Sequence, residues 1–136
     1  MERISFKGVI LGVAADIGGT IAASTILLLI FAGHLFNEQL SPEELDATLK
    51  PITQSGEFLL VSLIVGLSFS ALGGYVAARV AKREIYLNAG LVGVVSVLIG
   101  LTMGAEAPPW YTIAGYVLVI PAALFGAHLA DRHLMS

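Results

Sequence analysis

The chain alternates long apolar stretches with short polar ones. Four stretches contain no Asp, Glu, Lys or Arg and run for 21, 21, 21 and 24 residues, at 17–37, 58–78, 85–105 and 107–130. About 20 apolar residues cross the hydrocarbon core of a bilayer as an α-helix. The pattern predicts one all-α integral membrane domain over residues 1–136. Its four antiparallel transmembrane helices are expected at about 8–36, 57–79, 85–104 and 109–130.

The polar segment after the first apolar stretch contains a helix start of its own. Ser41-Pro42-Glu43-Glu44 places Ser at the N-cap, Pro in the first turn and Glu three residues after the cap, which is a capping box. Apolar residues then recur at near-helical spacing, at Leu45, Leu49 and Ile52. We therefore expect a short amphipathic helix on the outer membrane surface, which Pro51 should end or kink before the second long helix.

Charged residues are scarce and unevenly distributed. They make up 12% of the chain, about half the usual share in soluble proteins, which supports the membrane assignment. Six of the seven basic residues lie on one side of the predicted membrane, while the polar loop on the other side is rich in Asp and Glu. The positive-inside rule then predicts a multi-pass protein with both termini cytoplasmic. Trp110 and Tyr111 would belong to an aromatic belt at the outer interface.

Asp16 is the one acidic residue in the interior of an expected transmembrane helix, with apolar sequence on both sides. A carboxyl group in hydrocarbon is costly and generally faces a bundle interior or a water-filled cavity. Its neighbours at three- and four-residue spacing are Gly12, Val13, Gly19 and Thr20, mostly small residues that allow another helix to approach closely. We expect Asp16 to point toward protein, as a candidate proton- or ion-handling group with Thr20 beside it.

A second placement of Asp16 stays open. Residues 17–37 are enough to cross the membrane alone, which would put Asp16 at the inner boundary near a helix N-terminus. The whole apolar run 8–36 is roughly 43 Å long as a helix against a core of about 30 Å, so one end must project. In this second placement the carboxyl group is structural.

Three further polar groups are expected near the level of Asp16, counting from the cytoplasmic charges at about 1.5 Å per residue. They are Ser70, Ser96 and the backbone carbonyl of Val117, which Pro121 leaves without its helical hydrogen bond. The sequence therefore predicts a single polar layer that includes Asp16. Chance alignment is the alternative, because Ser and Pro are common in membrane helices.

Small residues recur on the predicted helices at spacings that favour close helix packing. Those expected to mediate it are Gly8, Gly12, Gly19, Gly73, Gly74, Gly93, Gly100, Gly104 and Gly126. The adjacent pair Gly73-Gly74 should mark a close helix crossing rather than a break. Asn88, near the start of the third long helix, is a candidate for a hydrogen bond between helices.

The sequence contains little that could support catalysis. It has no cysteine, and no pair of its three histidines has a metal-ligand spacing with a carboxylate. No nucleophile elbow, phosphate-binding loop or pair of carboxylates occurs in the apolar regions. We therefore expect no enzymatic activity, no cofactor, no metal site and no nucleic-acid partner. The expected partners are the lipid bilayer and either copies of this chain or other membrane proteins.

The letters LGGYVAAR at 72–79 are followed by a basic turn and a Gly-rich third helix. This arrangement resembles a loose group of small bacterial four-helix inner-membrane proteins without assigned function. The resemblance covers the second and third helices. It implies a location in the bacterial inner (plasma) membrane and no particular chemistry.

The letters ADIGGT at 15–20 lie in the first predicted helix. They are similar to the small multidrug resistance exporters, which carry a membrane-embedded glutamate followed by a Gly-Thr pair in helix one. Those proteins exchange protons for cationic drugs as dimers, so the resemblance implies that Asp16 binds proton and substrate. This chain departs from the family in having Asp for Glu, a long outer loop and no Trp in the third helix.

Two functions fit these features. The first is a non-enzymatic small inner-membrane protein that acts through helix packing, as a self-associating protein or a subunit of a membrane assembly. The number of small-residue ridges favours it, provided that the ridges are not used up within the chain. The second is a proton-coupled small-molecule transporter or small channel that uses Asp16.

Overall fold

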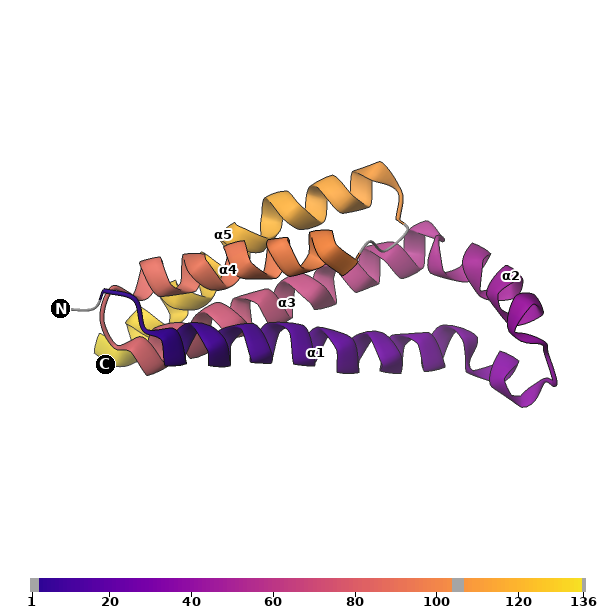
Figure 1. Ribbon diagram of the computed structural model, residues 1–136, viewed down its shortest axis with the longest axis horizontal. Helices are drawn as coiled ribbons and strands as arrows, with labels where there is room; N and C mark the ends of the chain where they lie inside the picture. The colour runs from indigo at the N-terminus through magenta and orange to yellow at the C-terminus, as the bar shows by residue number, and fades with distance from the viewer. Residues whose placement is uncertain (1–2, 104–106, 136) are drawn as a thin grey trace.

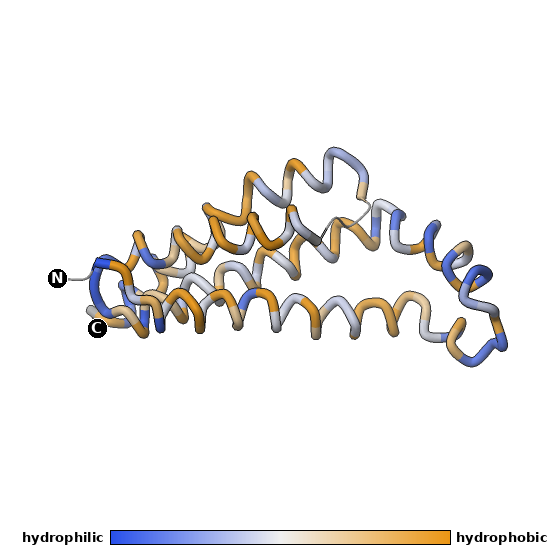
Figure 2. The backbone as a smooth tube through the Cα atoms, viewed as in Figure 1, coloured by the Kyte–Doolittle hydropathy of each residue, from blue (hydrophilic) through white to orange (hydrophobic). Residues whose placement is uncertain are grey.

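A computed structural model describes residues 3–103 and 107–135. The described residues are helical, with no strand among them. Four of the helices are long and apolar enough to cross a membrane. In chain order the elements are α1 (Phe6–Ala32), the 3₁₀ helix η1 (Gly33–Asn37), α2 (Pro42–Thr53), α3 (Gly56–Ala81), α4 (Ile85–Met103) and α5 (Pro109–Met135) (Figure 1). Hydrophilic residues gather at the two ends of the bundle and in α2, and the middles of the four long helices are largely hydrophobic (Figure 2).

The helix bounds lie close to those expected from the apolar stretches. Helix α1 begins at Phe6, two residues early, because the Ser5 hydroxyl accepts a hydrogen bond from the Gly8 amide at 3.1 Å and caps the helix. Its far end tightens into η1 instead of continuing as α-helix. Helix α5 continues to Met135, beyond the expected end at 130. Residue 104, where the third long helix was expected to end, lies outside the described residues.

Helix α2 has the predicted capping box. The Ser41 hydroxyl accepts from the Glu44 amide at 3.2 Å, and the Glu44 carboxylate accepts from the Ser41 amide at 3.3 Å. Pro51 lies in the last turn, and the helix ends at Thr53. None of the α2 residues is buried, and the helix lies at the end of the bundle opposite the two chain termini (Figure 1). We call these two ends of the bundle the α2 end and the Asn88 end.

The long helices touch backbone to backbone toward the Asn88 end. A methyl group built on Gly12 would lie 2.6 Å from the carbonyl oxygen of Gly73, and one built on Gly73 would lie 2.6 Å from that of Gly12. Methyl groups on Gly74 and Gly126 would collide with the α5 and α3 backbones respectively. The Gly73-Gly74 pair is therefore a double crossing point, where α3 meets α1 on one side and α5 on the other.

Most of the glycines expected to mediate packing are used within the chain. Gly8 faces the α3 backbone, Gly93 faces Ile120 of α5, and Gly19 and Gly100 face the rings of Phe69 and Tyr116. Gly104 lies outside the described residues. These small-residue faces thus bring the four long helices of one chain together.

The packing is asymmetric along the bundle. The fully buried residues lie toward the Asn88 end: Ala77, Ala78, Asn88, Ala89, Val92, Ala123, Ala127 and Ala130. Ala32, just before η1, is the exception. Toward the α2 end α5 diverges from α1 (Figure 1), while α1 and α3 stay in contact through the rings of Phe31 and Phe58, 5.4 Å apart. One half of the bundle is tightly packed and the other half is splayed.

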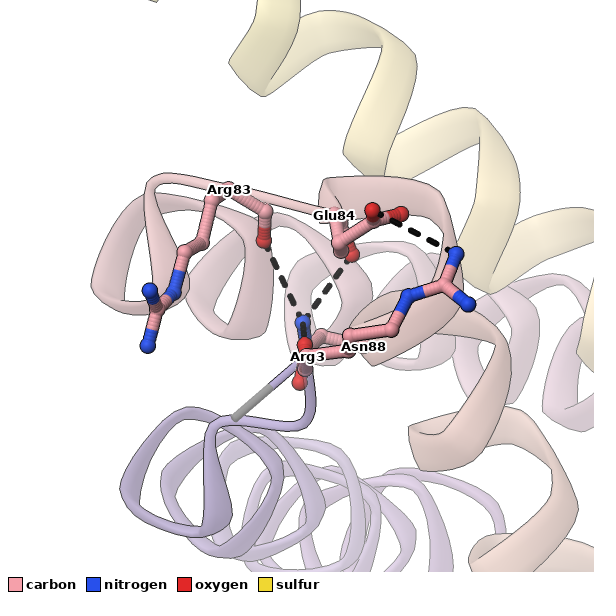
Figure 3. A network of polar contacts seen from close by, with 4 residues as sticks. All are labelled: Arg3, Arg83, Glu84 and Asn88. Atoms are coloured by element: carbon pink, nitrogen blue, oxygen red, sulfur yellow. Dashed lines mark hydrogen bonds and ion pairs between the residues drawn. The ribbon is translucent and has the colours of Figure 1, made fainter. Parts of the chain in front are cut away.

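Asn88 holds the start of the chain against the α3–α4 turn. Its side-chain oxygen accepts from the Ser5 amide at 2.7 Å, and its side-chain nitrogen donates to the carbonyls of Arg3, Arg83 and Glu84 at 2.9–3.3 Å (Figure 3). Asn88 is fully buried, so these bonds satisfy groups that water does not reach. The predicted polar contact at Asn88 therefore joins α4 to the segment before α1.

The backbone contact at Gly74 generates a stability prediction. Gly74→Ala places a methyl group against the Ala123 backbone, so α3 and α5 must separate. We expect the variant to lose about 1–3 kcal/mol of stability, as for overpacked cores, and to melt at lower temperature in detergent. Gly18→Ala is the matched control, because a methyl group there meets no atom within 4 Å. Equal melting temperatures for the two variants would contradict the packing described here.

Candidate functional site

Asp16 lies where α1, α3 and α4 meet, and it is 4% exposed. Its Oδ1 accepts a hydrogen bond from the Ser70 hydroxyl at 3.2 Å, and its Oδ2 accepts one from the Ser96 hydroxyl at 2.7 Å. Both carboxyl oxygens are thus held by donors from two other helices. The structure brings together three of the four groups that helix counting placed at one level.

The local sequence explains why these side chains meet. Contacts between α1 and α4 recur every four residues, with Gly12 against Val92 and Asp16 against Ser96, one helical turn apart. Gly73 of α3 is needed for the fit, because a methyl group there would lie 2.9 Å from the Asp16 Cβ. A larger residue at Gly12 or Gly73 would push α1 away and break the hydrogen bonds to the carboxyl group.

The fourth expected group, the Val117 carbonyl, does not belong to this layer. Val117 is 62% exposed and Pro121 is exposed, so this face of α5 points away from the bundle. The residues of α5 that face the site are Tyr116 and Val119 instead. Counting residues gave the correct level but not the rotation of α5, because neighbouring residues differ by about 100° around a helix.

A partly open cavity of about 610 Å³ begins at Asp16. All four long helices line it, and its lining residues lie at the level of Asp16 or toward the α2 end: 16–28 in α1, 62–70 in α3, 96–100 in α4 and 111–119 in α5. Thr20, the predicted neighbour of Asp16, is one of them. The cavity therefore occupies the splayed half of the bundle.

On the other side of Asp16 the bundle is closed. Val92 is fully buried against Gly12 and Gly73, and Gly74 abuts the α5 backbone at Ala123. These contacts leave no space between the helices at that level. Asp16 is therefore at the closed end of a cavity that runs toward only one end of the bundle.

The lining is apolar with scattered hydroxyl groups, from Thr20, Ser62, Ser70, Ser96 and Thr112 among others. Among the described residues that line it, Asp16 supplies the carboxyl group, and Tyr111 and Tyr116 are the other titratable residues. Tyr111 thus faces the cavity, although the sequence suggested an interfacial belt. Apolar walls with a few converging polar groups are typical of small-molecule sites.

Asp16 has no basic partner. A salt bridge joins Arg3 to Glu84 at 3.4 Å, near the Asn88 end and away from Asp16. Residues 3–103 and 107–135 contain no group of three His, Asp or Glu side chains that could hold a metal ion. The carboxyl group is therefore held by hydroxyl groups alone and stays accessible from the cavity to a small cation or a proton.

Some cavity residues had no clear signal in the sequence. Ser62, Gly66 and Tyr116 are ordinary residues of apolar helices, and only the three-dimensional packing brings them into the cavity that begins at Asp16.

Comparison of the chain with protein-family models, with curated proteins and with solved structures finds no match. The candidate site at Asp16 is therefore identified from its geometry.

The one-sided cavity predicts a contrast in thiol reactivity. The chain has no cysteine, so a single introduced one is unambiguous. In purified protein, Thr20→Cys should react readily with a small water-soluble thiol reagent. Val92→Cys should react on the order of tenfold or more slowly, since the buried site must open first. Similar reaction rates at both positions would show that the bundle is not sealed between Asp16 and the Asn88 end.

Proposed function

We propose that the chain is an integral protein of a bacterial inner (plasma) membrane that carries a small cation in exchange for a proton, with Asp16 binding each in turn. The observation that carries this proposal is the cavity of about 610 Å³ that ends on a carboxyl group without a basic partner. Asp16 is 4% exposed and holds hydrogen bonds from two serines, but it also lines the cavity, where a small ligand can reach it.

The orientation of the cavity follows from the charges. Arg3, Lys82 and Arg83 lie at the Asn88 end, and the acidic α2 lies at the opposite end. With four antiparallel transmembrane helices and the positive end in the cytoplasm, the cavity opens to the outside. The acidic loop around α2 then gives the mouth of the cavity a negative potential that favours cations.

Simple energetics supports an exchange site at Asp16. Burying Asp near the middle of a transmembrane helix costs about 2.5–3.5 kcal/mol on insertion scales. A hydrogen bond to a charged group contributes about 1.5–3 kcal/mol, so the two serine hydroxyls offset a cost of this size. They leave the net charge in place, and a proton or a cation from the cavity can neutralise it. Because a proton and a cation compete for the negative charge of Asp16, the binding of one releases the other.

A pure packing function has less support. The glycines expected to contact a partner face helices of the same chain, including Gly8, Gly12, Gly74 and Gly126. The small-residue ridges are thus largely used for the fold of the monomer. Self-association through other surfaces is compatible with transport.

The direct test is flux through liposomes that contain the purified chain. With an imposed pH gradient, wild type should move at least one cation from a panel of Na⁺, K⁺ and tetraphenylphosphonium. Asp16→Asn keeps the size of the side chain but cannot lose a proton or balance a cation, so we expect it to fold and to lose the flux. Equal flux in both proteins, or none in wild type, would contradict the proposed function.

A second variant separates the cavity from the carboxyl group. Gly66 lines the cavity, and a methyl group built on it meets no atom within 4 Å, so the side chain of Gly66→Leu should start in open space and occupy part of the cavity. The same substitution at Gly18, which is exposed and does not line the cavity, is the matched control. We expect Gly66→Leu to reduce flux and Gly18→Leu to leave it unchanged.

A further inference from the structure

The two serines that hold Asp16 are not equivalent. The Ser96 hydroxyl donates to Oδ2 at 2.7 Å, a short and strong bond. The Ser70 hydroxyl has two acceptors at the same distance, Oδ1 of Asp16 and the backbone carbonyl of Gly66, each at 3.2 Å. A hydroxyl group has one proton to donate, so Ser70 can fully satisfy only one of these acceptors at a time.

The geometry points to Ser70 as the positioning residue for proton exchange: the carboxyl group of Asp16 takes up its proton on Oδ1, and Ser70 changes hydrogen-bond partner when it does. Ser96 keeps donating to Oδ2 throughout. This inference rests on the proposed function and adds to it the atom that carries the proton and the residue that adapts to it.

Each state satisfies every polar atom. When Asp16 is ionised, Ser70 donates to Oδ1 and Ser96 to Oδ2. When a proton arrives from the cavity it bonds to Oδ1, and the new O–H donates to the Ser70 oxygen. The Ser70 proton then rotates toward the Gly66 carbonyl, which is already within reach. On cation binding, the Oδ1 proton leaves to the cavity and Ser70 turns back, so Ser70 itself neither gains nor loses a proton.

Oδ2 is the less suitable oxygen for the proton. A proton there would have to displace the 2.7 Å bond from Ser96, and within residues 3–103 and 107–135 the Ser96 hydroxyl donates to no acceptor besides Oδ2. Ser70 gives up only a longer bond and already has another acceptor. The two oxygens therefore differ because α3 places the Gly66 carbonyl one turn before Ser70, where it is a second acceptor for the Ser70 hydroxyl.

The groups around Asp16 offer no basic side chain to hold the exchanged proton, which leaves the positioning role to Ser70. The hydroxyl side chains at Asp16 are Ser70 of α3, Ser96 of α4 and Thr20 of its own helix. The titratable side chains of α5 that line the cavity are Tyr111 and Tyr116. No Lys, Arg or His is among the residues that line the cavity. A proton that neutralises Asp16 must therefore be held by the carboxyl group and its hydroxyl neighbours.

Infrared difference spectra between low and high pH test the assignment on the purified full chain. Protonated Asp16 should give a carboxyl C=O band that Asp16→Asn lacks. With the proton on Oδ1, the C=O oxygen is Oδ2 and accepts from Ser96. Ser96→Ala should therefore move the band to higher frequency, and Ser70→Ala should move it less. A role in folding alone would not produce this ranking.

The outcomes separate the inference from the proposed function. A larger shift in Ser70→Ala, or equal shifts in the two variants, would overturn the assignment to Oδ1 while leaving a titrating Asp16. The absence of any band that depends on Asp16 would overturn both. If an alanine variant does not fold, Ser70→Cys and Ser96→Cys keep the shape and weaken the donor, and the same ranking is expected.

Discussion

The contact between the backbones of Gly12 and Gly73 is the constraint on which the rest of the structure depends. It brings α1 against α3 so closely that a methyl group on either residue would lie 2.6 Å from the carbonyl oxygen of the other. One turn further along α1, this approach places the Asp16 carboxyl group within reach of Ser70 and Ser96. The same glycines that tighten one half of the bundle therefore position the carboxyl group of Asp16 at the cavity.

The half of the bundle toward the α2 end is packed differently. Beyond Asp16 the glycines Gly19 and Gly100 face aromatic rings rather than backbone, and Gly66 and Gly115 have open space where a side chain would be. Helices that are tightly crossed at one end and not at the other must diverge, and the divergence leaves a cavity. In the proposed carrier the tight half prevents leakage and the splayed half admits a cation.

Much of the fold could be predicted from the sequence. The length of the apolar stretches gave the four long helices, and the capping box at Ser41 gave the start of α2. The level of Asp16, Ser70 and Ser96 followed from the rise per residue. The rotation of each helix about its axis could not be predicted in this way, because it depends on which glycines cross. For this reason the Val117 carbonyl was wrongly included in the polar layer. The cavity could not be predicted either, since it results from the divergence of helices rather than from any one residue.

We propose that a proton and a cation compete for Asp16. This competition is tested most directly by measuring proton release into a weakly buffered solution while tetraphenylphosphonium, Na⁺ or K⁺ is titrated into the purified protein. We predict that wild type releases a proton for each cation bound and that Asp16→Asn releases none. Cation binding without proton release, or release that persists in Asp16→Asn, would contradict the claim. Failure of wild type to bind any of the three cations would contradict it as well.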